Sequence, residues 1–244
     1  MTAVRVLGLD TATLQATVAI VDEQGVLAEA ERQVTTHGDT LLALVDEALR
    51  GARLQVAELD GVACGRGPGS FTGLRIGMAT AKGLCLATGK PLICVSSLLP
   101  LAEAARQAIG DDSRLVAALL DARRQEVYAG LFRDGVLLEP ELLLGPGALA
   151  RRLRERAAEL RIGDGDARLL LCGDGALLYR DELLEALGDL AQLAPEGCHV
   201  IRARHIARAA LARLAVGDVD DLAAAAPLYV RPPDARLPAT EVGR

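Results

Sequence analysis

The sequence predicts an α/β fold of two related lobes, each a mixed sheet with flanking helices. Hydrophobic residues make up 51% of the 244 residues and charged residues 25%, which is typical of a globular chain with a substantial core. Short apolar runs of β type alternate with segments whose apolar residues recur at helical spacing. The second half repeats the order of the first, with strands before helices. We place the lobe boundary near residue 100.

The first half begins with three apolar runs joined by short turns, which predict a three-stranded meander. Strands are expected at residues 4–10, 16–22, 26–34, 60–65 and 91–97. A helix is expected at 39–51, with Asp39 as its N-cap and its apolar residues at helical spacing. A second helix is expected from Phe71 to residue 88.

The second half predicts a similar set of elements. Helices are expected at 101–110, 145–160, 175–188 and 202–214, and strands at 114–122, 126–135, 136–144 and 169–173. Pro140 interrupts the third of these strands, and residues 163–167 form a loop. The lobes are therefore assigned to residues 1–100 and 101–231. The last helix is allowed to return to the first lobe, and residues 232–244 are expected to form a flexible tail.

Composition and charge argue against a general nucleic-acid binder. Only 2% of the residues are aromatic and none is Trp, whereas platforms for single-stranded nucleic acid stack bases on exposed aromatic rings. The net charge of −6 is the wrong sign for binding a phosphate backbone.

Cysteine usage and the N-terminal residues predict a cytoplasmic protein. The five cysteines form no C-x-x-C pair and their number is odd, so we interpret them as buried thiols in a reducing compartment. The first residues lack the pattern of a signal peptide, and no uncharged apolar run approaches the length of a membrane span.

Residues 65–89 are the most informative segment. Their glycine-rich start lies between a predicted strand and a predicted helix, an arrangement that suits an anion. The G-x-G-x-x-G pattern is broken, however, and no P-loop motif or G-x-S-x-G elbow occurs. A tight structural turn and a phosphate cradle are both consistent with this loop.

The helix that follows carries a stripe of small residues, Gly73, Gly77 and Ala81, at i, i+4 and i+8. Glycine inside a helix costs about 1 kcal/mol relative to alanine, so another backbone must come close to offset it. One interpretation is tight packing on the sheet of the same lobe. The other is a smooth face that docks a partner subunit.

Several motifs together resemble the TsaB family, also called YeaZ. They are DTAT (10–13), GRGPGSFTGLRIGMATAKGL (65–84), VSSL (95–98), DARRQEVY (121–128) and PLYVR (227–231). The resemblance covers nearly the whole chain, with local departures at Arg124-Gln125 and Gly38. It implies two lobes of the actin-like, sugar-kinase and Hsp70 type. It also implies a non-catalytic scaffold or activator of the enzyme TsaD, which makes threonylcarbamoyladenosine beside the anticodon of tRNA.

The resemblance further implies partners and an interface. The expected partners are TsaD, the TsaE ATPase in the assembled complex, a second copy of the chain when alone, and tRNA indirectly, with no membrane. We assign the partner surface to helices 39–51 and 71–88. The interface residues are Leu41, Leu44, Val45, Gly73, Arg75, Ile76, Gly77, Met78, Thr80 and Ala81.

The histidines argue against a metal-dependent enzyme. TsaD is expected to bind metal through an H-x-x-x-H helix after a strand that resembles residues 91–95 here. His37, His199 and His205 lie outside that position and no two are one helical turn apart. We therefore expect no catalytic residue, no metal ligand and no required cofactor.

A nucleotide-dependent enzyme of the same fold (an ATPase, kinase or hydrolase) is the alternative function. By resemblance to the actin-like fold, ATP or ADP would be held by Asp10, Thr11, Thr13, Gly173 and Gly175. Gly173 and Gly175 also fit a plain turn between a strand and a helix.

Two predicted helices are rich in arginine. The residues are Arg151, Arg152, Arg154 and Arg156, with Arg161 after them, and Arg202, Arg204, Arg208 and Arg213. A solvated helix face explains them, and the alternative is a contribution to steering tRNA toward the assembled complex.

Overall fold

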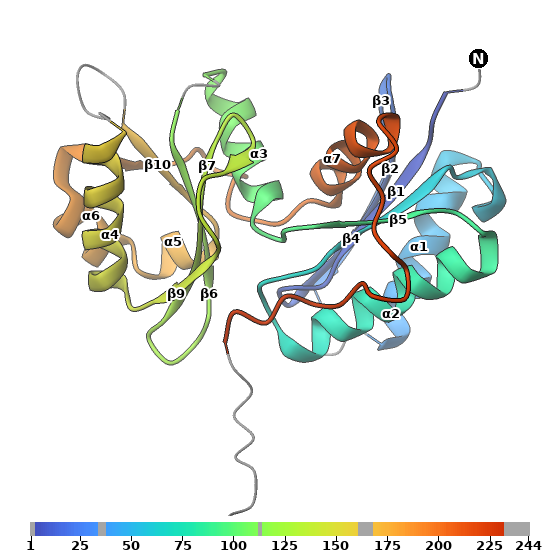
Figure 1. The fold of residues 1–244 in the computed structure, drawn as a ribbon, viewed down its shortest axis with the longest axis horizontal. Helices are drawn as coiled ribbons and strands as arrows, with labels where there is room; N and C mark the ends of the chain where they lie inside the picture. The colour runs from blue at the N-terminus through green and yellow to red at the C-terminus, as the bar shows by residue number, and fades with distance from the viewer. Residues whose placement is uncertain (1–2, 34–37, 112–113, 161–167, 232–244) are drawn as a thin grey trace, which may run out of the picture.

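Two mixed sheets, each with helices packed on it, make up the molecule (Figure 1). The computed structural model describes residues 3–33, 38–111, 114–160 and 168–231. The predicted loop at 163–167 and the predicted tail at 232–244 lie outside these residues, as does the side chain of Asp39. None of the described helices combines the length and the apolar composition of a membrane-spanning segment.

The first sheet has the strand order β3-β2-β1-β4-β5. Its strands are β1 (Val6–Asp10), β2 (Gln15–Asp22), β3 (Gly25–Gln33), β4 (Gly61–Gly65) and β5 (Leu92–Val95). β1, β2 and β3 are antiparallel neighbours, while β1, β4 and β5 run parallel. The connecting helices are α1 (Gly38–Ala52), the short 3-10 turn η1 (Val56–Glu58) and α2 (Phe71–Thr88).

The second sheet repeats this arrangement, with the order β8-β7-β6-β10-β11. Its strands are β6 (Val116–Asp121), β7 (Val127–Arg133), β8 (Val136–Leu137), β10 (Leu169–Cys172) and β11 (Ala191–Leu193), with β9 (Leu142–Leu144) added beside β7. The pairing senses match those of the first sheet strand for strand. Its connecting helices are α4 (Pro146–Glu159), α5 (Asp174–Leu178), α6 (Arg180–Leu187) and the 3-10 turn η2 (Gly188–Leu190).

The helix that follows each sheet packs on the other one. α3 (Leu99–Ile109) follows β5 but contacts β6, β7 and β10, and α7 (Ala203–Ala215) follows β11 but covers β1 and β2. The backbone of α7 comes so close to β1 that a Cβ atom on Gly8 would lie 2.7 Å from the Ala203 carbonyl oxygen. The boundary therefore falls between β5 and α3, and residues 203–215 belong to the first lobe in space.

Side-chain alternation along β1 separates the two faces of the first sheet. Leu7 and Leu9 pack with α1 and α2, whereas Val6 packs with α7. All five cysteines are buried and free, as predicted.

The structure differs from the predicted elements in three places. Residues 175–188 form two helices because Tyr179, with φ −107° and ψ 25°, leaves the helical conformation between α5 and α6. Residues 136–144 form two short strands, β8 and β9, on either side of Pro140. The short strand β11 was not predicted, since three residues carry too little periodicity to detect.

Candidate functional site

Asp10 was predicted to bind nucleotide, and the structure places its carboxylate inside the protein, fully buried. Its Oδ2 accepts a hydrogen bond of 2.6 Å from Ser97 Oγ, and its Oδ1 accepts one of 2.7 Å from the Ala12 backbone N–H. Burial raises the pKa of Asp10 to about 6, against the opposing effect of these hydrogen bonds. The side chain therefore ties the ends of β1 and β5 together.

Thr11, also predicted to bind nucleotide, likewise faces inward. Its hydroxyl donates a 2.8 Å hydrogen bond to the Gly73 carbonyl oxygen in the first turn of α2, and the residue is fully buried. Neither Asp10 nor Thr11 lines the cleft between the lobes that is described below.

The glycine-rich loop is packed against its own chain. A Cβ atom on Gly67 would lie 2.8 Å from the Leu228 carbonyl oxygen, and one on Gly69 would lie 2.5 Å from the Ala12 carbonyl oxygen. Because contacts this short cannot accommodate a side chain, packing alone accounts for these glycines. The geometry favours the structural turn over the phosphate cradle.

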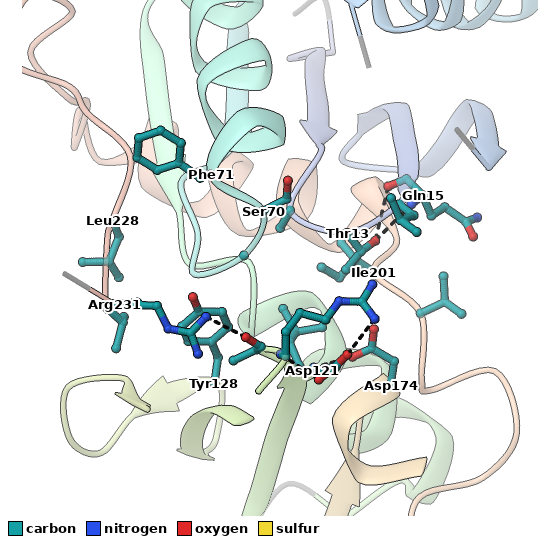
Figure 2. A pocket seen from close by; sticks show the side chains of 18 of the residues that line it. Thr13, Gln15, Ser70, Phe71, Asp121, Tyr128, Asp174, Ile201, Leu228 and Arg231 are labelled. Atoms are coloured by element: carbon teal, nitrogen blue, oxygen red, sulfur yellow. Dashed lines mark hydrogen bonds and ion pairs between the residues drawn. The ribbon is translucent and has the colours of Figure 1, made fainter. Parts of the chain in front are cut away.

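A cleft of about 850 Å³ lies between the lobes (Figure 2). Thr13 comes from the β1–β2 turn and Gln15 from the start of β2, and Asp121 and Asp174 come from the second lobe. The other lining residues are Ala12, Leu14, Gln33, Gly69, Ser70, Phe71, Leu120, Ala122, Arg123, Tyr128, His199, Val200, Ile201, Leu228, Tyr229, Val230 and Arg231.

Thr13 is the only one of the five predicted nucleotide-binding residues that lines this cleft, within the part of the chain that the structure describes. Gly175 is packed behind β6, where a Cβ atom would lie 2.9 Å from the Leu120 carbonyl carbon. A Cβ atom on Gly173 would overlap the Leu119 carbonyl oxygen. Gly173 therefore fits the plain turn that the sequence also allowed, and Gly175 lies within α5, where close packing accounts for it.

Charged groups gather at the second-lobe side of the cleft. Asp174 Oδ1 accepts a 2.9 Å hydrogen bond from the Asp121 backbone N–H, and burial raises the pKa of Asp174. The guanidinium of Arg123 lies 3.2 Å from the Asp121 carboxylate. Arg123, Arg124 and Gln125 all have positive φ, between 55° and 63°, in the tight turn between β6 and β7.

Most of the predicted partner-interface residues are buried in the chain's own core. Leu41, Leu44 and Val45 of α1, and Gly73, Gly77, Met78 and Ala81 of α2, face the first sheet. The reason is that Gly77 packs directly on β1, where a Cβ atom would overlap the Thr11 hydroxyl. Of the predicted set, Arg75 is exposed, and Ile76 and Thr80 are half-buried.

The outward side of α2 carries a second stripe of small residues, which the sequence analysis did not assign to the interface. Ala79, Gly83 and Ala87 lie at i, i+4 and i+8 and are exposed, and nothing lies within 4 Å of where a Cβ atom on Gly83 would sit. Leu86 beside them is 74% exposed, and α1, which packs next to α2, exposes 58% of Leu42. The same spacing rule that selected Gly73 and Gly77 would have found this stripe.

Several of the arginines in the two arginine-rich helices are engaged in ion pairs and hydrogen bonds. Arg202, directly before α7, pairs with Glu31 on β3, and Arg204 in α7 pairs with Glu29 on the same strand. In α4, Arg152 pairs with Glu139, Arg156 pairs with Glu159, and Arg154 donates to the Ala186 carbonyl oxygen. These contacts favour a solvated, internally paired surface over a nucleic-acid contact.

Among the described residues, no three His, Cys, Asp or Glu side chains are grouped as a metal ion would need.

Two lobes with matching sheets, and a cleft between them, define a protein of the actin-like and sugar-kinase fold class. Solved structures agree. The hexokinase of the ROK type from Thermus thermophilus is similar with a TM-score of 0.50 at 17% identity, covering 85% of this chain and 99% of that one. YeaZ from Pseudomonas aeruginosa is similar with a TM-score of 0.75 at 28% identity, covering 94% of this chain and all of that one.

Sequence comparisons identify the family. The family model for TsaD, tRNA N6-adenosine threonylcarbamoyltransferase, matches residues 15–142. The tRNA threonylcarbamoyladenosine biosynthesis protein TsaB of Escherichia coli K12 is 34% identical over 199 residues, covering 78% of this chain and 85% of that protein. The Bacillus subtilis protein of the same name is 33% identical over 135 residues, covering 54% and 57%. The chain belongs to the TsaB (YeaZ) family, as its motifs predicted.

Proposed function

We propose that this chain is a non-catalytic subunit in tRNA threonylcarbamoyladenosine biosynthesis, where it binds and activates the transferase TsaD. Its curated relatives are named for that pathway. The exposed stripe of small residues on α2 supports the binding of a partner, and the inward hydrogen bonds of Asp10 and Thr11 support a packing role for these two residues. We expect it to act in the cytoplasm, without a cofactor of its own.

The observation that carries this proposal is the uncharged outer side of α2. This α2 outer face consists of Ile76, Ala79, Thr80, Gly83, Leu86 and Ala87. An exposed glycine in the middle of a helix costs about 1 kcal/mol relative to alanine, and Leu86 leaves apolar surface in water. Both costs are offset when a partner helix packs closely on this face. Without TsaD, a second copy of the chain would use the same face.

Gly83→Arg tests the proposal, with Gly83→Ala as the matched control. Position 83 has open space around it, so both variants should fold with an unchanged or slightly raised melting temperature. Arginine should weaken binding to purified TsaD by at least about 30-fold and abolish tRNA modification by the reconstituted complex, as loss of an interface hot spot does. Alanine should preserve both. If the arginine variant binds TsaD as tightly as the wild type does, the α2 outer face is not the binding surface.

A second candidate function is nucleotide-dependent catalysis in the interlobe cleft, which the size of the cleft and the presence of Thr13 and Asp174 favour. Its test is ATP turnover by the purified chain. We expect none above background. A turnover that Thr13→Val and Asp174→Asn both abolish would establish the enzyme instead.

A further inference from the structure

The last described stretch of the chain, residues 218–231, runs from the end of α7 across the first lobe to the second; we call it the strap (Figure 1). It begins by pairing with the edge strand β5. The Asp220 backbone N–H donates to the Leu92 carbonyl oxygen at 2.9 Å, and the Asp220 carboxylate accepts from the Cys94 N–H at 2.8 Å. The strap therefore covers one end of the first sheet.

The middle of the strap is held by α2 and the glycine-rich loop. The Leu228 N–H donates to the Arg66 carbonyl oxygen at 2.6 Å. The phenol oxygen of Tyr229 accepts a 3.0 Å hydrogen bond from Arg75 Nε, and the Tyr229 ring lies 5.1 Å from the Phe71 ring. The Arg75 guanidinium also lies 3.8 Å above the Phe71 ring, an ordinary cation–π distance.

The end of the strap reaches the second lobe. Arg231 donates a 2.8 Å hydrogen bond to the Ala122 carbonyl oxygen and forms an ion pair with Glu126. Its guanidinium lies 5.9 Å from the Tyr128 ring. These groups flank the tight turn between β6 and β7, and Figure 2 shows Arg231 and Tyr128 side by side at the wall of the cleft.

Within the described residues, two covalent connections join the lobes, at residues 96–98 and 194–202. We propose that the strap is a third, non-covalent connection, with Arg231 as its latch, which fixes the angle between the lobes. Two packed lobes that share two connecting segments can rotate about them. The latch opposes that rotation because the bonds from Arg231 to Ala122 and Glu126 join the strap directly to the β6–β7 turn of the second lobe. Since Arg75 and Arg231 hold the same short segment, a change at Arg75 on the first lobe is transmitted to the β6–β7 turn on the second.

Arg231→Met tests the latch in the full chain by hydrogen exchange, with Arg204→Met as the matched control. Arg204 also pairs with a glutamate, Glu29, but both of these residues lie on the first lobe, in α7 and β3. We expect exchange at residues 121–128 to become about tenfold faster in Arg231→Met and to stay unchanged in the control. The radius of gyration from small-angle scattering should also increase.

The coupling has its own test, Tyr229→Phe, which removes the acceptor for Arg75 and keeps the ring. We expect exchange at residues 121–128 to rise severalfold, although the lost bond lies on the first lobe. Should Arg231→Met fail to fold, Arg231→Lys retains the charge and should give an intermediate increase. Unchanged exchange at 121–128 in Arg231→Met would overturn the latch, and unchanged exchange in Tyr229→Phe would overturn the coupling. The measurements use the isolated chain and do not depend on TsaD binding.

Discussion

The hydroxyl of Thr11 occupies the space in which a side chain on Gly77 would begin. The same hydroxyl donates its hydrogen to the Gly73 carbonyl oxygen, one turn earlier in α2. Helix and strand therefore approach closely only because position 77 has no Cβ atom. The stripe of Gly73, Gly77 and Ala81 is a contact within the first lobe.

We predict that Gly77→Leu lowers the melting temperature by several degrees. Overpacking of this kind costs about 1–3 kcal/mol, and in a chain of this length each kcal/mol shifts the midpoint by about 2–4 °C. Gly83→Ala on the opposite side of the same helix is the control and should stabilise the chain by up to about 1 kcal/mol. Thermal unfolding of both variants tests this prediction. An unchanged melting temperature for Gly77→Leu would contradict the close packing of α2 on β1.

Asp10 gives the stability a pH dependence of known sign. Its pKa is raised from 3.8 to about 6 in the folded chain, so the folded state binds the proton more tightly than the unfolded state. The contribution of Asp10 to the free energy of unfolding is therefore present at low pH and is lost as the pH rises from about 4 to 6. Between pH 4 and pH 7 the free energy of unfolding of Asp10→Asn should therefore rise by about 3 kcal/mol relative to that of the wild type, at about 1.4 kcal/mol per pKa unit. Urea unfolding across that range measures it.

His205 acts in the opposite direction. Burial, with Arg204 and Arg208 nearby, lowers its pKa from 6.5 to about 4, so the folded state favours the neutral ring. Its contribution is present above pH 6.5 and is lost as the pH falls toward 4. As the pH falls through that window, the free energy of unfolding of His205→Leu should therefore rise by about 3 kcal/mol relative to that of the wild type. The same urea series checks this, and a parallel shift at all pH values would contradict it.

Ser70 caps α2, and its hydroxyl accepts a 3.2 Å hydrogen bond from the Gly73 N–H. Ser70→Ala should cost about 1 kcal/mol of stability because that donor loses its partner. Ser70→Asp, which retains an acceptor at the helix N-terminus, should restore most of it. Equal losses for both variants would mean that the hydroxyl does not act as a cap.

Local patterns predicted most of the fold. The helix expected from Phe71 to residue 88 is α2 with the same bounds, because a capping serine and a following glycine are local signals. The break at Tyr179 was missed, since the apolar spacing of residues 175–188 is continuous with one helix.

The site was harder to predict because two equivalent patterns lie on one helix. Gly73, Gly77 and Ala81 share their spacing with Ala79, Gly83 and Ala87, and only tertiary packing decides which stripe meets the sheet. The cleft wall joins Tyr229 to Arg75 and Phe71, which lie about 150 residues away in the sequence. No local pattern reports such a contact.

Because α3 packs on the second sheet and α7 packs on the first, the two lobes are completed in a particular order during translation. All elements of the second sheet and its helix α3 lie in one continuous stretch, residues 99–193. The first sheet is made earlier but keeps one face uncovered until α7, at residues 203–215, has left the ribosome. Translation therefore completes the second lobe before the first. Buried residues such as Val6 and Val21 therefore remain exposed to chaperones and proteases until α7 has been translated.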